Sequence, residues 1–130
     1  MIVVDTSVWI DYVNGIISPQ TDILDNLLRE QRIVTGDLVI TEFLQGFKNE
    51  KEYQQAKQLM DSLEYFDFVG KTLAIKAAQN FRKLRRNGIT IRKTIDVLIA
   101  TFCIEHHMPL LHSDHDYDLM EKIIGLQILR

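Results

Sequence analysis

Four acidic residues occupy positions where an acid would not stabilise a small folded protein. Each of them follows, opens or interrupts an apolar segment that is typical of a protein core; they are Asp5, Glu42, Asp96 and Asp114. Burial of an unpartnered carboxylate costs free energy, whereas coordination of a cation offsets that cost. If the four side chains converge, they offer the oxygen ligands that hard metal ions prefer. The pattern therefore predicts metal-dependent chemistry.

Strands and helices alternate along the chain, which indicates an α/β protein with a mostly parallel central sheet and helices on both faces. Short apolar or β-branched runs predict strands at 2–4, 33–35, 66–69, 109–111 and 126–129. Helical spacing predicts helices at 8–13, 19–28, 38–47, 49–63, 71–86, 93–107 and 117–124. Thr6 or Ser7 is expected to cap the first of these helices. Ligands bind at the carboxyl ends of such strands, where Asp5 and Asp114 lie. Glu42 and Asp96 are expected near helix starts.

Length and composition indicate one globular domain spanning residues 1–130. The chain is 46% apolar and 25% charged, which is ordinary for a folded protein with one core. Its single cysteine, Cys103, cannot form an internal disulfide and fits a reducing compartment. No apolar stretch reaches the roughly 18 residues of a membrane span, and no basic segment precedes the first apolar run. We expect a cytoplasmic protein without a membrane partner.

The basic residues are concentrated in one segment although the net charge is −3. Between Asp67 and Asp96 there is no acidic residue, and eight of the fifteen basic residues lie there. A solvated helix face would explain this segment by itself. Together with a cluster of metal-binding acids, it favours a polyanionic partner such as a nucleic acid.

Each acid also has an ordinary structural explanation. Asp5 and Asp96 could be helix N-caps, Glu42 could face solvent, and Asp114 could belong to a surface turn. Zinc is an alternative metal because His112 and His115 flank Asp114. However, the chain lacks zinc-like ligand spacing, and His106-His107 would make a poor chelate. Cys103 lies in an apolar helix and is not expected to act as a nucleophile.

The segments around the four acids resemble the motifs of a known family, the PIN-domain ribonucleases, and among them the VapC-type toxins of bacterial toxin–antitoxin pairs. These segments are IVVDTSVWID at 2–11, VITEFLQG at 39–46, RKTIDVLIA at 92–100 and LLHSDHDY at 110–117. Their order and spacing resemble the family over essentially the whole chain. The resemblance implies the three-layer α/β/α fold of a PIN domain.

The resemblance also implies a metal site with one or two Mg²⁺ or Mn²⁺ ions. Its metal ligands would be Asp5, Glu42, Asp96 and Asp114, supported from one side by Asp116. Thr6 or Ser7 would orient a carboxylate through its hydroxyl. Two positions depart from the usual pattern. Tyr117 stands where Phe is more common and is expected to affect packing rather than chemistry, and His115 stands where Arg or Lys is common.

The function implied is that of a toxin that hydrolyses RNA phosphodiesters with metal-activated water, acting on tRNA or other structured RNA and leaving 5′-phosphate and 3′-hydroxyl ends. Candidate contacts to the RNA backbone are Arg82, Arg85, Arg86, Arg92 and Lys93. The resemblance further implies a homodimer and a cognate VapB-type antitoxin. Ile16, Ile17, Phe43 and Phe47 could belong to an interface or to the core.

Three other classes of protein share some of these features. A phosphoacceptor receiver domain needs an early acidic pair and a late lysine, and His112 stands in place of that lysine. A haloacid-type phosphatase needs a second Asp two residues after the first, where this chain has Ser7. A non-catalytic PIN-fold module for RNA binding or scaffolding would keep the fold without turnover.

Overall fold

Four parallel strands form the sheet of the computed structural model, which describes all residues from 1 to 130. The strands are β1 (Ile2–Val4), β2 (Ile33–Gly36), β3 (Glu64–Phe66) and β4 (Leu110–Leu111), in the order β3-β2-β1-β4. Seven helices surround them: α1 (Thr6–Val13), α2 (Pro19–Glu30), α3 (Asp37–Leu44), α4 (Glu50–Asp61), α5 (Lys71–Arg86), α6 (Thr94–Glu105) and α7 (His115–Ile124).

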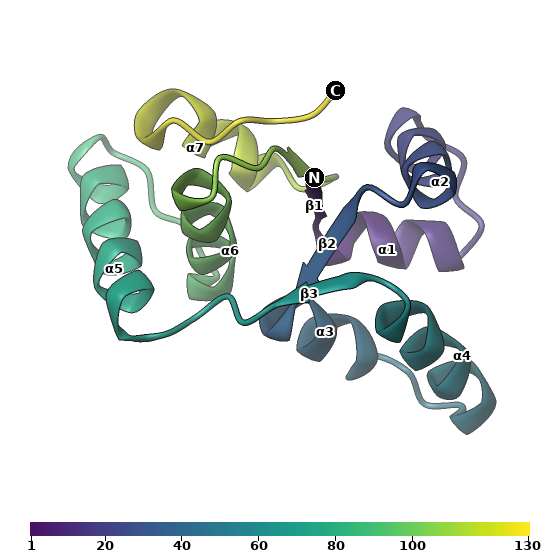
Figure 1. Ribbon diagram of the computed structural model, residues 1–130. Helices are drawn as coiled ribbons and strands as arrows, with labels where there is room; N and C mark the ends of the chain where they lie inside the picture. The colour runs from purple at the N-terminus through teal and green to yellow at the C-terminus, as the bar shows by residue number, and fades with distance from the viewer.

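The helices form two groups with the sheet between them (Figure 1). On one side α1 contacts both α2 and α3, and α3 contacts α4; on the other side α5, α6 and α7 pack together. This arrangement confirms the predicted three-layer α/β/α fold with a parallel sheet. Strands β1 and β4 are neighbours, with Val4 beside Leu111, so the residues that follow them meet at one edge of the sheet.

The core is built from the residues that the apolar pattern marked. Val3, Val4, Leu110 and Leu111 are fully buried, and Trp9 is the largest of the fully buried side chains. Helix α6 is buried on nearly every face: all residues from Val97 to Cys103 are buried except Leu98, which is half-buried. No helix has the length and apolar character that crossing a membrane requires.

The third strand lies earlier than predicted. The expected strand at 66–69 is replaced by β3 at Glu64–Phe66, which pairs with β2 up to Gly36. Asp37 Oδ1 accepts the Phe68 amide at 2.9 Å and so takes the hydrogen bond that continued pairing would use. Phe68 instead stacks on Phe102 at 3.9 Å between ring centroids. The alternation of apolar residues at 66–69 therefore has two causes: Phe66 pairs in strand β3, and Phe68 packs into the core beyond it.

Other boundaries also differ from prediction. Asp5, rather than Thr6 or Ser7, caps α1, since its carboxylate accepts the Ser7 amide. The helix expected at 38–47 ends at Leu44, and the expected strand at 126–129 is a single bridge between Leu110 and Ile128. Of the four proposed interface residues, Phe43 is a core residue, whereas Ile17 is 88% exposed.

Candidate metal centre

The sheet brings Asp5 and Asp114 together because each follows the carboxyl end of a central strand. Asp5 caps α1 directly after β1, and Asp114 caps α7 shortly after the neighbouring β4. Asp96 enters from the first turn of α6 and is only 2% exposed. Glu42 is the sixth residue of α3, so the expectation that it lies near a helix start is wrong. Its side chain reaches the site from the later part of that helix.

Five acids form two groups that share one member. Carboxylate oxygens of Asp5, Glu42 and Asp96 lie within 4.8 Å of one another, and so do those of Asp96, Asp114 and Asp116. Asp96 belongs to both groups. All four acids singled out from the sequence therefore converge, and Asp116 lies with them.

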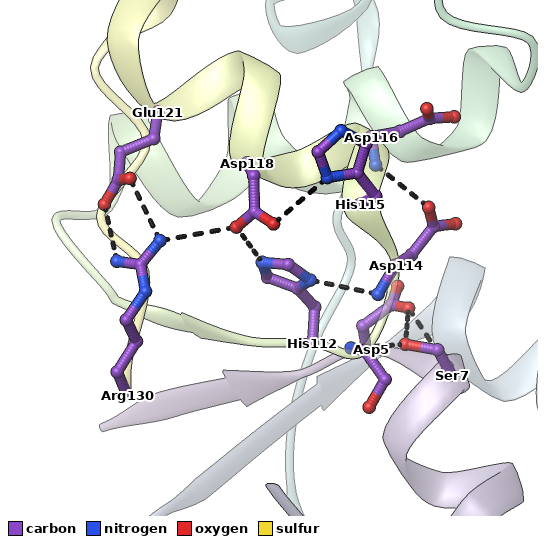
Figure 2. A network of polar contacts seen from close by, with 10 residues as sticks. Asp5, Ser7, His112, Asp114, His115, Asp116, Asp118, Glu121 and Arg130 are labelled. Atoms are coloured by element: carbon purple, nitrogen blue, oxygen red, sulfur yellow. Dashed lines mark hydrogen bonds and ion pairs between the residues drawn. The ribbon is translucent and has the colours of Figure 1, made fainter.

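Hydroxyl groups next to Asp5 hold two of the carboxylates. The Thr6 hydroxyl donates to Glu42 Oε1 at 3.0 Å. The Ser7 hydroxyl donates to Asp5 Oδ2 at 2.6 Å, and the Ser7 amide donates to the same oxygen at 3.0 Å (Figure 2). Both Thr6 and Ser7 thus contact an acid, each a different one.

Tyr117 makes a contact with the acids that the sequence did not indicate. Its hydroxyl donates to Asp5 Oδ1 at 2.8 Å and lies 3.3 Å from Asp96 Oδ1. The expectation that Tyr in place of Phe affects packing alone is therefore wrong, because the added oxygen contacts two of the acids. A tyrosine three residues after Asp114 carried no sequence signal for this contact, which joins residues 112 positions apart.

Crowding and burial of the carboxylates dominate the electrostatics of the group. Burial, reinforced by the charge of Asp5, raises the pKa of Asp96 to about 7, and nearby Lys93 opposes the rise. Burial likewise raises the pKa of Glu42. Asp96 Oδ2 is buried without any hydrogen-bond partner. An all-oxygen donor set with a buried unpartnered oxygen suits a hard divalent cation, which would stabilise the charged form of these acids.

The histidines near the acids contact other groups of the chain and are not placed to bind a metal. His112 is buried, its Nδ1 accepts the Asp114 amide at 3.0 Å, and its Nε2 lies 3.3 Å from Asp118 Oδ1 (Figure 2). Since both ring nitrogens face groups of the chain itself, His112 is a poor zinc ligand. Burial lowers its pKa. His115, whose side chain is 81% exposed, lies beside Asp118 rather than within either acidic group. Burial raises the pKa of the Cys103 thiol, so it is no nucleophile.

The five basic residues proposed to contact RNA are exposed near the end of α6 that carries Asp96. Helices α5 and α6 run antiparallel, because Lys76 contacts Glu105 and Asn80 Nδ2 donates to Thr101 Oγ1 at 3.0 Å. The carboxyl end of α5 therefore lies beside the amino end of α6. Five exposed cations belong to this region: Arg82, Arg85, Arg86, Arg92 and Lys93.

The fold and these motifs agree with a known family. The family model for the PIN domain matches residues 2–123, and the chain belongs to the PIN-domain family. It is 31% identical over 130 residues to Ribonuclease VapC11 of Mycobacterium tuberculosis and to VapC ribonuclease Mb1587 of Mycobacterium bovis. In both cases the match covers 98% of this chain and 96% of the relative.

Solved structures of low sequence identity share the fold. VapBC2 from Rickettsia felis, bound to a DNA fragment from its promoter, matches with a TM-score of 0.78 at 20% identity, covering 99% of this chain and 98% of that one. FitAcB from Neisseria gonorrhoeae matches with a TM-score of 0.72 at 17% identity, covering 100% and 97%. The receiver-domain and phosphatase alternatives are therefore set aside.

Proposed function

We propose that this chain is a metal-dependent endoribonuclease that acts as the toxin of a toxin–antitoxin pair, with residues 1–130 working as one PIN-like domain. The observation that carries the proposal is the pair of three-carboxylate groups that share Asp96. Relatives of nearly equal length are named VapC ribonucleases, which supports RNA as the substrate. The same relationship favours the enzyme over a non-catalytic PIN-fold module.

Asp5, Glu42, Asp96 and Asp114 would hold one or two Mg²⁺ or Mn²⁺ ions, with Asp116 supporting the Asp114 side. A bound divalent ion would lower the pKa of an attacking water and offset charge on the leaving oxygen. The chain itself supplies orientation: Ser7 fixes Asp5, and Thr6 fixes Glu42. Since Asp96 stands in both acidic groups, its replacement should affect every metal position at once.

The proposed reaction joins a water oxygen to phosphorus and breaks the bond from phosphorus to the 3′ oxygen. One proton of the water is released, the leaving 3′ oxygen gains a proton, and the products carry 5′-phosphate and 3′-hydroxyl ends. Water as the nucleophile distinguishes this reaction from attack by the 2′-hydroxyl, which leaves a cyclic phosphate. The ends of the fragments therefore report the mechanism.

Cations at the amino end of α6 would hold the RNA backbone near the acids. Arg85 and Arg86 lie on the last turn of α5, and Lys93 precedes α6. Arg82 and Arg92 complete this set. Contacts to phosphate fix the position of a nucleic acid without reading its sequence. Selectivity would then come from RNA shape and unpaired bases, as in tRNA or another structured RNA.

Partners follow from the relationship to VapC proteins. We propose a cognate VapB-type antitoxin, because structures with this fold include VapBC complexes from Rickettsia felis and Salmonella typhimurium. We also propose a homodimer in the cytoplasm. The exposed apolar residues Ile16 and Ile17, on the loop between α1 and α2, are available for such contacts.

The test is cleavage of purified small RNA by the antitoxin-free protein in Mg²⁺, Mn²⁺ or EDTA, beside the Asp96→Asn variant. The expected result is a set of discrete fragments with 5′-phosphate ends, absent with EDTA and with the variant. Fragments that persist with the variant would contradict the assignment of Asp96. RNA binding by the folded protein without any cut in either metal would favour the non-catalytic module.

A further inference from the structure

One buried hydroxyl joins two acids that come from different layers of the fold. Tyr117 Oη lies 2.8 Å from Asp5 Oδ1, at the end of β1, and 3.3 Å from Asp96 Oδ1, in α6. The Tyr117 side chain is fully buried, with an exposed fraction of 0%. The hydroxyl therefore contacts the two acids and not bulk solvent.

The contact completes the support of the Asp5 carboxylate. Ser7 donates two hydrogen bonds to Asp5 Oδ2, and Tyr117 donates to Asp5 Oδ1. With a donor on each oxygen, the plane of the carboxylate is fixed from both sides. Its remaining lone pairs can face a cation.

The contact also distinguishes the two oxygens of Asp96. Oδ1 faces the Tyr117 hydroxyl, whereas Oδ2 is buried and has no hydrogen-bond partner. A phenol has one proton, and the shorter distance assigns that proton to Asp5. Its oxygen lies against Asp96 Oδ1, which leaves Oδ2 as the unengaged ligand atom. Oδ2 is thus the oxygen of Asp96 that has no hydrogen bond from the chain.

The position of Tyr117 is itself fixed by the helix that carries two other acids. Its amide donates to the Asp114 carbonyl at 3.2 Å in the first turn of α7, and its ring packs 5.1 Å from the His112 ring. Asp114 and Asp116 lie on the same turn. A single rigid turn therefore links the Asp114–Asp116 side of the site to Asp5 and Asp96.

From this geometry we propose that Tyr117 is a positioning residue of the metal centre, whose hydroxyl orients Asp5 for a divalent cation and lies against Asp96. The inference rests on the proposed metal-dependent function and deepens it. Residues that orient ligands through hydrogen bonds change metal affinity by about 10–100-fold when they are replaced. Tyr117→Phe removes only the hydroxyl oxygen and keeps the ring that fills the core.

The matched control removes a phenol–carboxylate hydrogen bond elsewhere. Tyr12 donates to Asp25 Oδ1 at 3.1 Å, and neither residue belongs to the acidic groups. The measurement is the dissociation constant for Mn²⁺, from the electron paramagnetic resonance signal of free Mn²⁺ titrated with metal-free protein. We expect Tyr117→Phe to bind at least about tenfold more weakly than wild type, and Tyr12→Phe to bind as wild type does.

Equal dissociation constants for Tyr117→Phe and wild type would overturn the role of Tyr117 and leave the proposed function standing. Absence of Mn²⁺ binding by the folded wild type would overturn the metal centre and this inference together. A second measurement needs no variant: the hydroxyl proton of Tyr117 in the wild type should be shielded from solvent exchange, and its NMR resonance should shift on addition of Mg²⁺. A resonance that does not move while Mg²⁺ binds would also overturn the inference.

Discussion

The Ser7 hydroxyl donates a 2.6 Å hydrogen bond to Asp5 Oδ2 and accepts the Ser113 amide at 3.0 Å. One side chain thus connects the acid after β1 to the segment after β4, 106 positions further along the chain. The connection explains how two acids of like charge keep a fixed spacing at an edge of the sheet. A substitution at Ser7 therefore tests whether the site needs this link between the two segments.

Replacing Ser7 with alanine should weaken the site without unfolding the protein. Asp5 would lose its shortest hydrogen bond but keep the Ser7 amide and Tyr117. We expect RNA cleavage to slow by about tenfold or more, since supporting residues of metal ligands have effects of that size. Initial cleavage rates at saturating Mn²⁺ measure it. Ser62→Ala is the control, because the Ser62 hydroxyl donates to the Leu59 carbonyl and contacts none of the acids. Equal rates for the two variants would contradict the prediction.

The crowded acids should make the metal-free protein less stable as the pH rises. The pKa of Asp96 is raised from 3.8 to about 7, so the folded state holds a proton that the unfolded state has lost between these values. This contribution to stability is complete below about pH 4 and is lost as the pH rises through about 7. Asp96→Asn should remove the loss and increase the free energy of unfolding at pH 8 in EDTA by about 1–3 kcal/mol.

Urea denaturation at pH 5 and pH 8, with EDTA throughout, measures that difference for wild type and Asp96→Asn. The increase in the free energy of unfolding of Asp96→Asn over wild type should be larger at pH 8 than at pH 5. A variant that is less stable than wild type at pH 8 would show that Asp96 is satisfied without a cation.

Charge reversal at the end of α5 should weaken RNA binding through electrostatics. Arg85 and Arg86 are exposed on the turn next to the amino end of α6. Arg85→Glu should raise KM for RNA by about tenfold and lower the salt dependence of binding, because a phosphate contact releases a counterion. Lys51→Glu, an equal change on the exposed face of α4, should leave both quantities near wild type. Equal effects of the two variants would indicate net charge rather than a binding surface.

The end of β2 leaves no room for a side chain at Gly36. A Cβ there would lie 2.3 Å from the Phe68 ring and 2.7 Å from the Phe66 carbonyl. Gly36→Ala should lower the free energy of unfolding by about 1–3 kcal/mol because the ring and strand must shift. Gly46→Ala is the control, since its nearest contact would be an ordinary 3.7 Å. Thermal unfolding compares them, and equal midpoints would contradict the packing of Phe68 described above.

Sequence patterns predicted the parts of this molecule that depend on local order. Apolar runs that end in an acid placed Asp5 and Asp114 at the carboxyl ends of strands, and those strands are neighbours in the sheet. The prediction for Glu42 was less accurate: it was expected near a helix start, but α3 begins at Asp37 and ends at Leu44. Phe66 and Phe68 show the limit of alternation, since only one of the two residues lies in a strand.

The contacts of Tyr117 and His112 could not be predicted from the chain. Tyr117 contacts Asp5 and Asp96 because α7 packs beside β1 and α6, and no local spacing encodes that packing. His112 accepts the nearby Asp114 amide, a contact that depends on the shape of the turn between β4 and α7. A tyrosine in a core position looks the same whether its hydroxyl meets solvent, backbone or a carboxylate. The sequence therefore indicated which acids converge and that Thr6 or Ser7 holds a carboxylate, but it did not indicate the contacts of Tyr117.

The most direct test of the central claim, that these acids form a divalent metal centre, is anomalous diffraction from crystals of the antitoxin-free protein soaked in Mn²⁺. The account predicts at least one anomalous peak within coordinating distance of Asp96 Oδ2, with Asp5 or Asp114 among the other ligands, and no such peak in Asp96→Asn crystals. An ordered wild-type site without a peak, or Mn²⁺ bound only at other acids, would contradict it.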